Sequence, residues 1–589
     1  MFLIKIMLLF IGTIFISIDC VAQKTENNHM ILNTINTVID KIIRDTEFEY
    51  DRKAQKPSDA IQSVNFNHQF GIKYDGFAYA LSYVHCPENG IYQFGISAGG
   101  NADIWINKEK VYSAIKPNEF SFIEFAYDRY QFPSKVDIQC KKGHNQILIK
   151  LSEGKDWRFF IAALQKNGLI NDKVLFTIEP DIKSSISKWL VCGPFEAGSL
   201  NTELPENTIL PFYKTGNGFL TWMIPAIPFI TKVNSGENAS FKKHSYLEWH
   251  YSTGATLWSI LNYSEVTQNQ KQEDFVRSCC EFNLKNLYYF NFQYDELNEI
   301  HGFNHRISRM QMLDDASAPA LPYLKLRMNG KLEISDSILK KVEDFLLYKQ
   351  SRLADGTFCR PEPWQETIWA DDLFMSAPYL MMLGKSTGNP KYFDEAAFQV
   401  ISFYNHLFDS KTGLCRHAWV NSSEKDSIPY WSRANGWIIW ATTEVLSKLP
   451  EKHKDFKTIK ELYKKHVDGL LSYQNQNGFL HQLINDTSSF TETSSTAMLL
   501  IALASGVNQG WLSPKYEKFA IKSWEAVQSN IAADGTVKGI CEGTSISTDC
   551  KYYFERQQMD HDPRGLGAVI TAGLEFYKMN SKLTKSENR

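Results

Sequence analysis

The chain has 589 residues, of which 63 are Lys or Arg and 66 are Asp or Glu, giving a net charge of −3; 43% of the residues are hydrophobic. This composition is typical of a folded globular protein and excludes a disordered chain, a collagen and a coiled-coil rod. The balanced charge argues against nucleic acid as a partner, because wrapping nucleic acid requires a basic face.

An apolar segment opens the chain. Lys5 precedes a nearly uninterrupted apolar run over residues 6–18, and Cys20 and Ala22 place small residues before Gln23. This pattern predicts a signal peptide over residues 1–22 and a periplasmic protein. Lipidation at Cys20 is the less favoured alternative, because the preceding Asp19 fits a lipobox poorly. No later stretch reaches about 18 apolar residues, so no membrane span is expected.

The ten cysteines are scattered along the chain, and none forms a C-x-x-C pair. This spacing indicates neither a disulfide framework nor a zinc site. We therefore expect buried single thiols, with pairing of Cys541 and Cys550 left open. No metal or organic cofactor is expected.

Residues 24–185 are predicted to form a separate domain, because residues 70 to about 165 alternate between apolar and polar side chains with a period of two. Such runs, broken by Gly, Asn and Pro, predict an antiparallel β-sandwich, here as an accessory domain. The alternation is clearest in two runs, Tyr92, Phe94 and Ile96, and Ile147, Ile149 and Leu151. Whether this domain is structural or binds glycans stays open. Residues 186–245, rich in Pro and Gly, are interpreted as a connecting region with some β structure.

From residue 246 to about 580 the apolar period becomes helical. Glycine-centred turns recur every 54 to 65 residues, at Gly302, Gly356, Gly413, Gly478 and Gly535. Each interval is long enough for one pair of helices, and repetition at a regular period is typical of stacked units. Six such pairs predict a closed (α/α)6 barrel that forms the catalytic domain, with an open helical solenoid as the alternative.

Three segments near these turns carry chemically distinctive side chains. They are residues 366–375 with Asp371 and Asp372, residues 413–437 with His417 and Arg433, and residues 478–494. Carboxyl, imidazole, guanidinium and indole groups together suit an anionic sugar, since Arg binds carboxylates bidentately. Each also has a simpler explanation: Asp is a good helix N-cap, histidines satisfy loop carbonyls, and tryptophans pack helices.

The segments WADDLFM over 369–375 and WSRANGW over 431–437 resemble signature segments of glycoside hydrolase family 105, the unsaturated rhamnogalacturonyl hydrolases. LDDA over 313–316, GFLHQ over 478–482 and ETS over 492–494 are similar to the same family in the same order. The resemblance covers about residues 245–580. It implies an (α/α)6 barrel and a hydrolase that removes a 4,5-unsaturated uronic acid, galacturonyl or glucuronyl, from the non-reducing end of polysaccharide-lyase products.

The resemblance also implies roles for single residues. Asp371 matches the general acid and base, and Asp315 matches a second carboxylate that contacts the sugar. The predicted substrate-binding set is Asp315, Trp369, His417, Trp431, Arg433, Asn435, Trp437 and His481. Where the family often has glycine, this chain has Ala418 and Ala434, and Asp315 is followed by Ala316-Ser317, which bears on the shape of the site more than on the reaction.

The implied partner is an anionic unsaturated oligosaccharide. One alternative is a family 88-like unsaturated glucuronyl hydrolase acting on glycosaminoglycan-type fragments, and another is a non-catalytic glycan-binding toroid. A third is an inverting hydrolase of saturated chains, which needs a second carboxyl group about 6.5–9.5 Å from the first. The sequence does not determine the parent polysaccharide or the oligomeric state.

Overall fold

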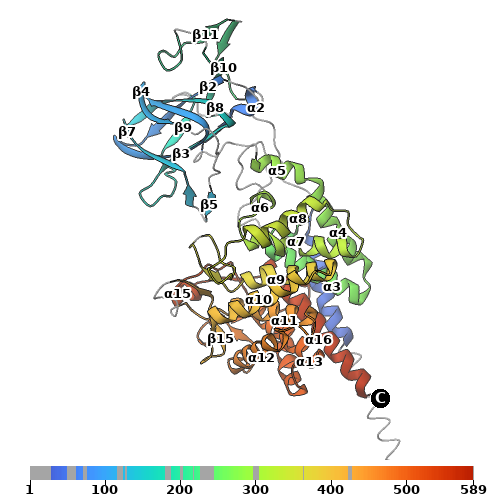
Figure 1. Ribbon diagram of the computed structural model, residues 1–589. Coiled ribbons are helices and arrows are strands. Elements are labelled where there is room, and N and C mark those ends of the chain that lie inside the picture. The colour runs from blue at the N-terminus through green and yellow to red at the C-terminus, as the bar shows by residue number, and fades with distance from the viewer. Residues whose placement is uncertain are drawn as a thin grey trace, which may run out of the picture. The chain divides into compact units, whose positions relative to one another are not determined.

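The computed structural model describes residues 28–48, 62–70, 76–115, 124–126, 129–178, 188–198, 203–216, 218–225, 245–295, 304–362, 364–421 and 428–587 (Figure 1). Contacts divide the chain into a helical unit and a β unit, with boundaries near residues 49 and 235. The predicted signal peptide and the turn at Gly302 lie outside the described residues.

The β unit is built on one hydrogen-bonded antiparallel sheet. Its main strands follow the order β10-β2-β8-β3-β4, with β1 added to β8, β7 to β3 and β9 to β2. The strands of the sheet are β1 (Gln62–Asn65), β2 (Gly76–Cys86), β3 (Gly90–Ile106), β4 (Glu109–Ala114), β7 (Ser134–Cys140), β8 (Gly143–Leu164), β9 (Leu175–Thr177) and β10 (Leu190–Glu196). Helix α2 (Phe66–Phe70) and the two-stranded pairs β5 (Glu124–Ala126) with β6 (Arg129–Gln131) and β11 (Phe212–Thr215) with β12 (Gly218–Thr221) complete this unit.

Two long strands, β3 and β8, connect the parts of this sheet. Their mutual register shifts between Ala98 and Asn101, so each has two segments with different neighbours. Side chains from both segments, including Phe94 and Ile104, lie in one buried core. The predicted period-two alternation is thus confirmed as core packing. Strand β10 pairs with β2, so the region interpreted from sequence as a connection with some β structure contributes a strand to the sheet.

The helical unit alternates helices that are buried on all sides with helices that bury one face. The helices that are buried along most of their length are α3 (Tyr251–Thr267), α7 (Ser317–Met328), α9 (Asp372–Thr387), α11 (Ser432–Lys448), α13 (Thr493–Asn508) and the first half of α16 (Pro563–Glu587). The second set is α4 (Gln270–Lys285), α8 (Asp336–Asp344), α10 (Pro390–Leu407), α12 (Phe456–Ser472) and α14 (Glu517–Ser529). A helix that is apolar all round belongs in the interior of a fold, whereas an amphipathic one covers it.

Among the described residues, the mostly buried helices contact one another in a cycle, α3–α7–α9–α11–α13–α16, and α16 returns to α3. The amphipathic helices α4, α10, α12 and α14 each pack against the buried helix that precedes them in the chain. Short elements fill the connections: α5 (Leu287–Asp295), α6 (His305–Arg309), η3 (Leu313–Asp315), the π-helix η4 (Phe345–Lys349) and α15 (Cys550–Phe554).

Local sequence signals explain where these helices begin and end. Gly388 adopts a left-handed conformation with φ of 69° and ends α9. Asn389 then caps α10 by accepting a hydrogen bond from the Lys391 amide at 3.1 Å, and Pro390 occupies the first helical position. Glycine after a helix, and Asn followed by Pro before one, are the residues that these positions favour.

The four predicted glycine turns in the described residues are confirmed. Gly356, Gly413, Gly478 and Gly535 all have φ between 72° and 91°, a region that other residues rarely adopt. Each turn follows an amphipathic helix and leads to the next buried helix. A Cβ on Gly413 would lie 2.8 Å from Gly469 on α12, and one on Gly535 would lie 2.1 Å from the carbonyl oxygen of Thr37. These glycines therefore allow each turn to touch the next helix of the outer set.

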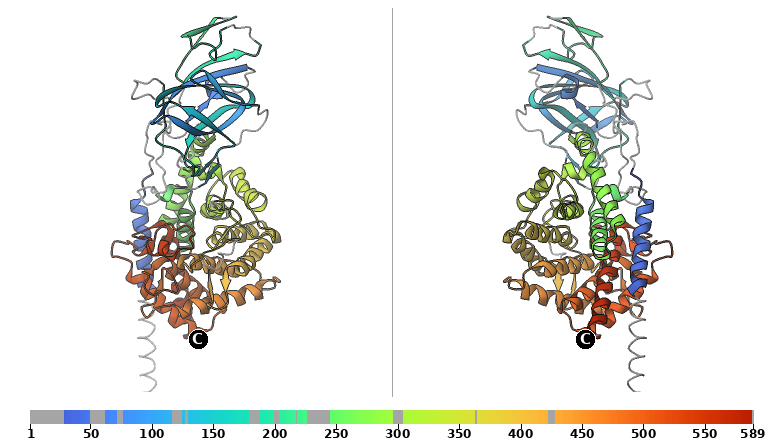
Figure 2. Two further views of the ribbon diagram at one scale, coloured as in Figure 1. Left: turned by 90° about the vertical axis from the view of Figure 1, so that its left-hand side faces the viewer. Right: turned by 90° about the vertical axis from the view of Figure 1, so that its right-hand side faces the viewer.

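Thr37 belongs to a helix over residues 28–45, which the sequence analysis had assigned to the β domain. In the structure this helix is part of the helical unit and lies beside α16 (Figure 2). Ile35 packs against Gly573 of α16, and the Tyr263 hydroxyl of α3 donates to the Leu32 carbonyl at 3.0 Å. It occupies an outer position beside α16.

Within the described part of the chain, no helix has the length and hydropathy needed to cross a bilayer. The described residues also contain no cluster of three or more His, Cys, Asp or Glu side chains suited to a metal ion. All nine described cysteines are unpaired thiols, and Cys550 is the exposed one.

Candidate active site

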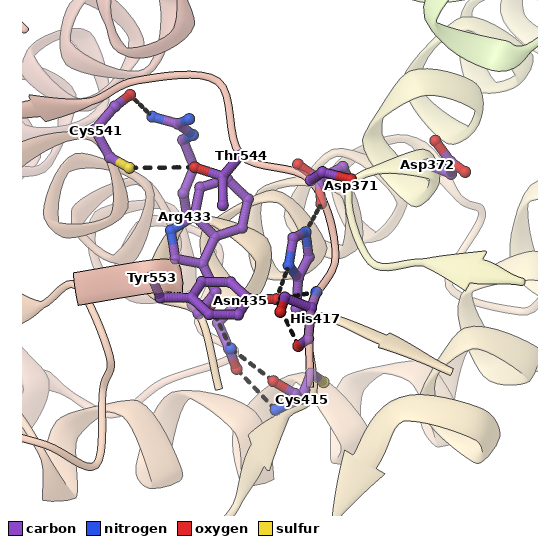
Figure 3. Close-up of polar contacts among 12 residues, drawn as sticks. Asp371, Asp372, Cys415, His417, Arg433, Asn435, Cys541, Thr544 and Tyr553 are labelled. Atoms are coloured by element: carbon purple, nitrogen blue, oxygen red, sulfur yellow. Dashed lines mark hydrogen bonds and ion pairs between the residues drawn. The ribbon is translucent and has the colours of Figure 1, made fainter. Parts of the chain in front are cut away.

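A short pair of strands brings the predicted acid next to the predicted histidine. Strands β13 (Ile368–Trp369) and β16 (Ala418–Trp419) pair in antiparallel register, and the Ala370 amide donates to the His417 carbonyl at 2.9 Å. Both strands follow glycine turns, those at Gly356 and Gly413. Asp371 and His417 therefore meet although 46 residues separate them (Figure 3).

Asp371 stands at the N-cap position of α9 but does not cap it. Its side chain accepts no hydrogen bond from the first turn of the helix. The side chain is 16% exposed, and Oδ2 lies 3.4 Å from Nε2 of His417. The two atoms thus face each other at a distance that is long for a hydrogen bond, and neither has another hydrogen-bond partner among the described residues. The simpler interpretation of Asp371 as a helix cap is therefore not supported, and its carboxyl group is available for chemistry.

His417 is completely buried between aromatic rings. Its Nδ1 lies 2.8 Å from the hydroxyl of Tyr553, and its ring lies 4.5 Å from that of Trp431 and 5.8 Å from that of Trp369. Burial lowers the pKa of His417, with Asp371 opposing the shift. The imidazole is therefore neutral at neutral pH and acts as a hydrogen-bonding group.

Arg360 anchors the other side of this region. Its guanidinium forms two hydrogen bonds with Asp372, at 2.8 and 2.6 Å, and a third with Asp314 at 3.1 Å. It also lies over the ring of Trp369, 4.0 Å from the ring centre. Burial raises the pKa of Asp372 to about 7 and also raises that of Asp314, in both cases against the opposing charge of Arg360.

Asp372 points away from the pair formed by Asp371 and His417 (Figure 3). Consecutive helical residues differ by about 100° in direction, which explains why the two carboxyl groups serve different partners. Asp372 holds Arg360 in place, and Arg360 in turn supports the ring of Trp369.

Asp315, predicted to contact the sugar, is placed differently. Its side chain is fully buried, and Arg309 binds both carboxylate oxygens at 2.8 Å. Arg306 lies 3.5 Å away. This carboxylate forms a buried ion pair, whereas the neighbouring Asp314 is 18% exposed and faces Arg360. The one-residue difference arises because η3 directs the two side chains to opposite sides, which the sequence pair alone does not reveal.

Trp431 and Arg433 are both buried and hold the loop after β19 (Ile540–Cys541). Trp431 Nε1 donates to Gln482 Oε1 at 3.1 Å, and the guanidinium of Arg433 lies over the Trp431 ring at 4.7 Å. The two terminal nitrogens of Arg433 donate to the carbonyl oxygens of Cys541 and Glu542. The structure therefore places Arg433 as a support of this loop, whereas the sequence predicted a direct grip on substrate.

Asn435 and Trp437, predicted to bind substrate, are buried in packing contacts. Asn435 accepts from the Cys415 amide and donates to its carbonyl, both at 2.7 Å, and so fixes the strand that leads to His417. Trp437 stacks on Trp440 and lies 4.7 Å from the ring of Phe374. Asn435 is completely buried and Trp437 is 2% exposed, so the contacts of both side chains in this structure are packing and hydrogen-bond contacts within the protein.

A buried histidine supports Asn435 from the outer helix α12. His466 Nε2 lies 3.0 Å from Asn435 Oδ1, and its Nδ1 lies 3.0 Å from the Tyr404 hydroxyl. Because the amide oxygen only accepts, His466 donates from Nε2 and accepts at Nδ1, which is the neutral form. Burial lowers the pKa of His466 to about 3.

The lowered pKa of His466 predicts that the folded protein loses stability in acid. The folded value of about 3 lies below the value of about 6.5 for an unfolded chain, so unfolded protein binds the proton first as pH falls. The contribution of neutral His466 to stability is therefore fully present above about pH 6.5. It is lost as the pH falls toward 3, by at most about 1.4 kcal/mol per pH unit. Denaturant unfolding of wild type and His466→Gln at several pH values should show a smaller slope for the variant. Parallel curves would contradict the assignment.

His481 does not reach the group around Asp371. It lies on β17 (Leu480–His481), and its Nδ1 contacts the Ser489 carbonyl at 2.7 Å. The next residue, Gln482, turns its side chain to Trp431 and Cys541. Because consecutive side chains of an extended strand point to opposite sides, His481 faces away.

Replacing His481 with Ala should therefore leave KM unchanged. The variant loses one hydrogen bond to a loop carbonyl, which lowers the free energy of unfolding by about 1 kcal/mol. Steady-state kinetics and denaturant unfolding measure the two effects separately. A large rise in KM at unchanged stability would restore the sequence-based interpretation.

Several residues of this region carried no decisive signal in the sequence. Tyr553 lies 136 residues after His417, and Arg360 lies in an irregular segment between two turns. Tyr251, at the start of α3, is surrounded by Arg433, Arg564, Asp314 and Asp371, which all act on its pKa, while burial raises it. Asp314 and Gln482, by contrast, lie in the segments 313–316 and 478–482 that resemble family 105.

Among the described residues, the helical unit places the Asp371 carboxyl group beside a buried imidazole and several indole rings, an arrangement that agrees with a glycoside hydrolase. A family model described as Glycosyl Hydrolase Family 88 matches residues 228–580, which is more than half of the chain. The chain belongs to this family.

Named relatives agree with the predicted resemblance to family 105. The chain is 26% identical over 354 residues to an unsaturated 3S-rhamnoglycuronyl hydrolase of Alteromonas sp. (strain LOR), covering 58% of this chain and 79% of that protein. It is 25% identical over 249 residues to the unsaturated rhamnogalacturonyl hydrolase YesR of Bacillus subtilis (strain 168), covering 41% and 71%.

A solved structure supports the fold. It is that of a possible member of the GH105 family from Salmonella enterica serovar Paratyphi A, with a TM-score of 0.50 and 18% identity. The match covers 62% of this chain and 88% of that chain.

Proposed function

We propose that this protein removes a 4,5-unsaturated uronic acid from the non-reducing end of polysaccharide-lyase products. The observation that carries the proposal is the Asp371 side chain. It is partly exposed, makes no capping hydrogen bond and lies 3.4 Å from a buried neutral histidine. The names of the relatives, which act on unsaturated rhamnoglycuronyl and rhamnogalacturonyl compounds, support the substrate class.

One carboxyl group suffices for this reaction. The substrate is a vinyl ether, electron-rich at C4. Asp371 donates its proton to C4, the C4=C5 electron pair forms the new C–H bond, and positive charge is shared by C5 and the ring oxygen. The Asp371 carboxylate then accepts a proton from water as the water oxygen bonds to C5. The resulting hemiketal opens, and the hemiacetal at C1 releases the remaining chain.

The neighbouring carboxylates favour this reaction over ordinary glycoside hydrolysis. An inverting enzyme needs a second carboxyl group that is free to activate water. Asp372 and Asp314 are bound to Arg360, and Asp315 is bound to Arg309. Each of these three carboxylates therefore has a cationic partner, and Asp371 remains the group available as acid and base.

A panel of lyase-generated oligosaccharides tests the proposal. Conversion removes the conjugated double bond, so ultraviolet absorbance falls as product forms. We expect wild type to bleach rhamnogalacturonan- or ulvan-type products. Bleaching only of glycosaminoglycan fragments would favour the family 88-like alternative, and sugar binding without bleaching of any compound would favour a non-catalytic toroid. Release of reducing ends from saturated chains alone would indicate an ordinary hydrolase.

The finer architecture belongs to the same proposal. We assign the helical unit as an (α/α)6 barrel, supported by the cycle of helix contacts, and the β unit as a sandwich, supported by the common core of both segments of β3 and β8. The catalytic domain then comprises residues 246–580 together with the helix over 28–45, and the accessory domain ends near residue 235.

We also propose that residues 1–22 direct secretion to the periplasm. The argument is the order of Lys5, the apolar run and the small residues before Gln23. Determination of the N-terminal residue of the exported protein tests it, since cleavage before Gln23 is expected. A lipid-modified Cys20 at the new terminus would favour the lipoprotein alternative.

A further inference from the structure

The hydroxyl of Tyr553 is the polar group that meets the far side of the His417 ring. Tyr553 lies on α15 and is buried, and its hydroxyl oxygen is 2.8 Å from His417 Nδ1. The opposite ring nitrogen, Nε2, lies 3.4 Å from Asp371 Oδ2. The three side chains thus form a row that connects the acid to the loop around residue 547 (Figure 3).

The donors and acceptors around the Tyr553 hydroxyl determine the direction of its hydrogen bond with His417. A phenol has one hydrogen to donate and lone pairs that accept. The Ser547 amide donates to the Tyr553 hydroxyl at 3.2 Å, which uses one lone pair. The phenolic hydrogen then has two acceptors in reach, His417 Nδ1 at 2.8 Å and the Ser547 carbonyl at 3.4 Å. The shorter contact favours donation to Nδ1.

The charge state of His417 decides how many protons its two ring nitrogens share. The charged or ionisable groups acting on it are Asp371, Arg360 and Arg433, together with the hydroxyl of Tyr553. Burial and the two arginines lower the pKa of His417, so the ring is neutral and carries one proton. If Nδ1 accepts from Tyr553, that proton resides on Nε2. In a neutral histidine, the hydrogen bond at one nitrogen fixes the tautomer at the other.

We propose that Tyr553 is a positioning residue that holds His417 in the tautomer with its proton on Nε2, directed at Asp371. This inference rests on the proposed function of Asp371. As Asp371 gives up its proton to C4, negative charge develops on its carboxylate, and the Nε2–H group stabilises that charge. The same contact orients the carboxylate for the later removal of a proton from water. In the opposite tautomer, the Nε2 lone pair would repel the developing carboxylate.

The first test reads the tautomer without substrate. In histidine labelled with nitrogen-15, protonated and unprotonated ring nitrogens give well-separated signals, and the His417→Gln variant assigns the signals of this ring. We expect wild type to show a protonated Nε2 and an unprotonated Nδ1. A protonated Nδ1 in wild type would overturn the proposal, whatever any variant does.

The second test removes the hydroxyl. In Tyr553→Phe, Nδ1 loses its donor, so we expect its proton occupancy to rise. Because general acid–base catalysis contributes about 10²–10⁴-fold and Asp371 remains, we expect kcat on an unsaturated disaccharide to fall by about 10-fold, with KM little changed. Unchanged nitrogen signals together with unchanged kcat would refute the role.

Tyr552→Phe is the matched control. The Tyr552 hydroxyl also accepts a hydrogen bond from the same loop, from the Ser545 amide at 2.9 Å, but makes no contact with His417. We expect this variant to keep both the wild-type tautomer and the wild-type kcat. Equal losses in the two variants would indicate that loop order alone is responsible. A wild-type enzyme inactive on every unsaturated uronide would refute the proposed function, while the nitrogen spectrum would still decide the tautomer.

Discussion

Asp371→Asn is expected to lower kcat on unsaturated uronides by about 10²–10⁴-fold, the usual contribution of general acid–base catalysis. Asparagine has nearly the same shape as aspartate but has no carboxyl proton to give to C4 and no carboxylate to accept a proton from water. Ultraviolet bleaching under single-turnover and steady-state conditions measures the loss.

The fold of this variant should be intact. Asp371 makes no capping hydrogen bond, and its contact with His417 is its single close ionic contact among the described residues. The thermal unfolding midpoint of Asp371→Asn should therefore stay close to that of wild type. Near-normal turnover by a folded variant would exclude Asp371 as the acid, and the proposed function would lose its main support.

Arg360→Met is expected to lower the free energy of unfolding by about 3–5 kcal/mol, the usual cost of removing one partner of a buried ion pair. Arg360 is 3% exposed and holds Asp372, which is equally buried, and Asp314. Methionine fills much of the same volume but leaves both carboxyl groups without their cation. Chemical denaturation of wild type and variant gives the difference.

The cost should depend on pH in a defined direction. The folded pKa of Asp372 is already raised to about 7, above the value of about 3.9 in an unfolded chain. Loss of Arg360 raises it further, because the opposing positive charge disappears. The variant can then relieve its buried charge by binding a proton at low pH. The stability difference between wild type and variant should therefore be larger at pH 8 than at pH 5.

Arg277→Met provides the control. Arg277 on α4 also pairs with two carboxylates, Asp274 at 2.8 Å and Glu281 at 3.0 Å, but all three side chains are at least one-third exposed. Exposed pairs of this kind contribute about 0–1 kcal/mol. Similar losses in Arg277→Met and Arg360→Met would mean that burial does not set the effect and that the charge network around Trp369 is unimportant.

Local patterns in the sequence predicted strands and turns that the structure contains. The period-two runs became the strands β3 and β8, and the glycine spacing marked four turns that all adopt positive φ. These features depend on neighbouring residues only, since side-chain alternation and backbone freedom are local properties. Asp371 and His417 each follow such a turn, and the resemblance to family 105 implies their roles.

The sequence did not reveal the hydrogen-bond and ionic partners of the remaining predicted residues. Asp314 and Asp315 differ by one position in sequence, yet one faces Arg360 and the other is bound by Arg309. Arg433 has the charge to bind a carboxylate, but its terminal nitrogens are used by carbonyl oxygens more than 100 residues away. A residue type indicates what a side chain can bind, whereas its partners depend on how distant segments meet.

The sequence by itself predicted the change from strands to helices along the chain, the glycine turns between the helix pairs and the segments that carry Asp371 and His417. Tertiary structure alone decided that a helix near the N-terminus lies in an outer position beside α16, and that Tyr553 and Arg360 flank the acid. The physical reason is the sequence separation between the residues that determine each feature. The periods of helices and strands depend on residues that are close together in the sequence. The contacts between residues 37 and 535, and between residues 417 and 553, depend instead on how the whole set of helices packs together.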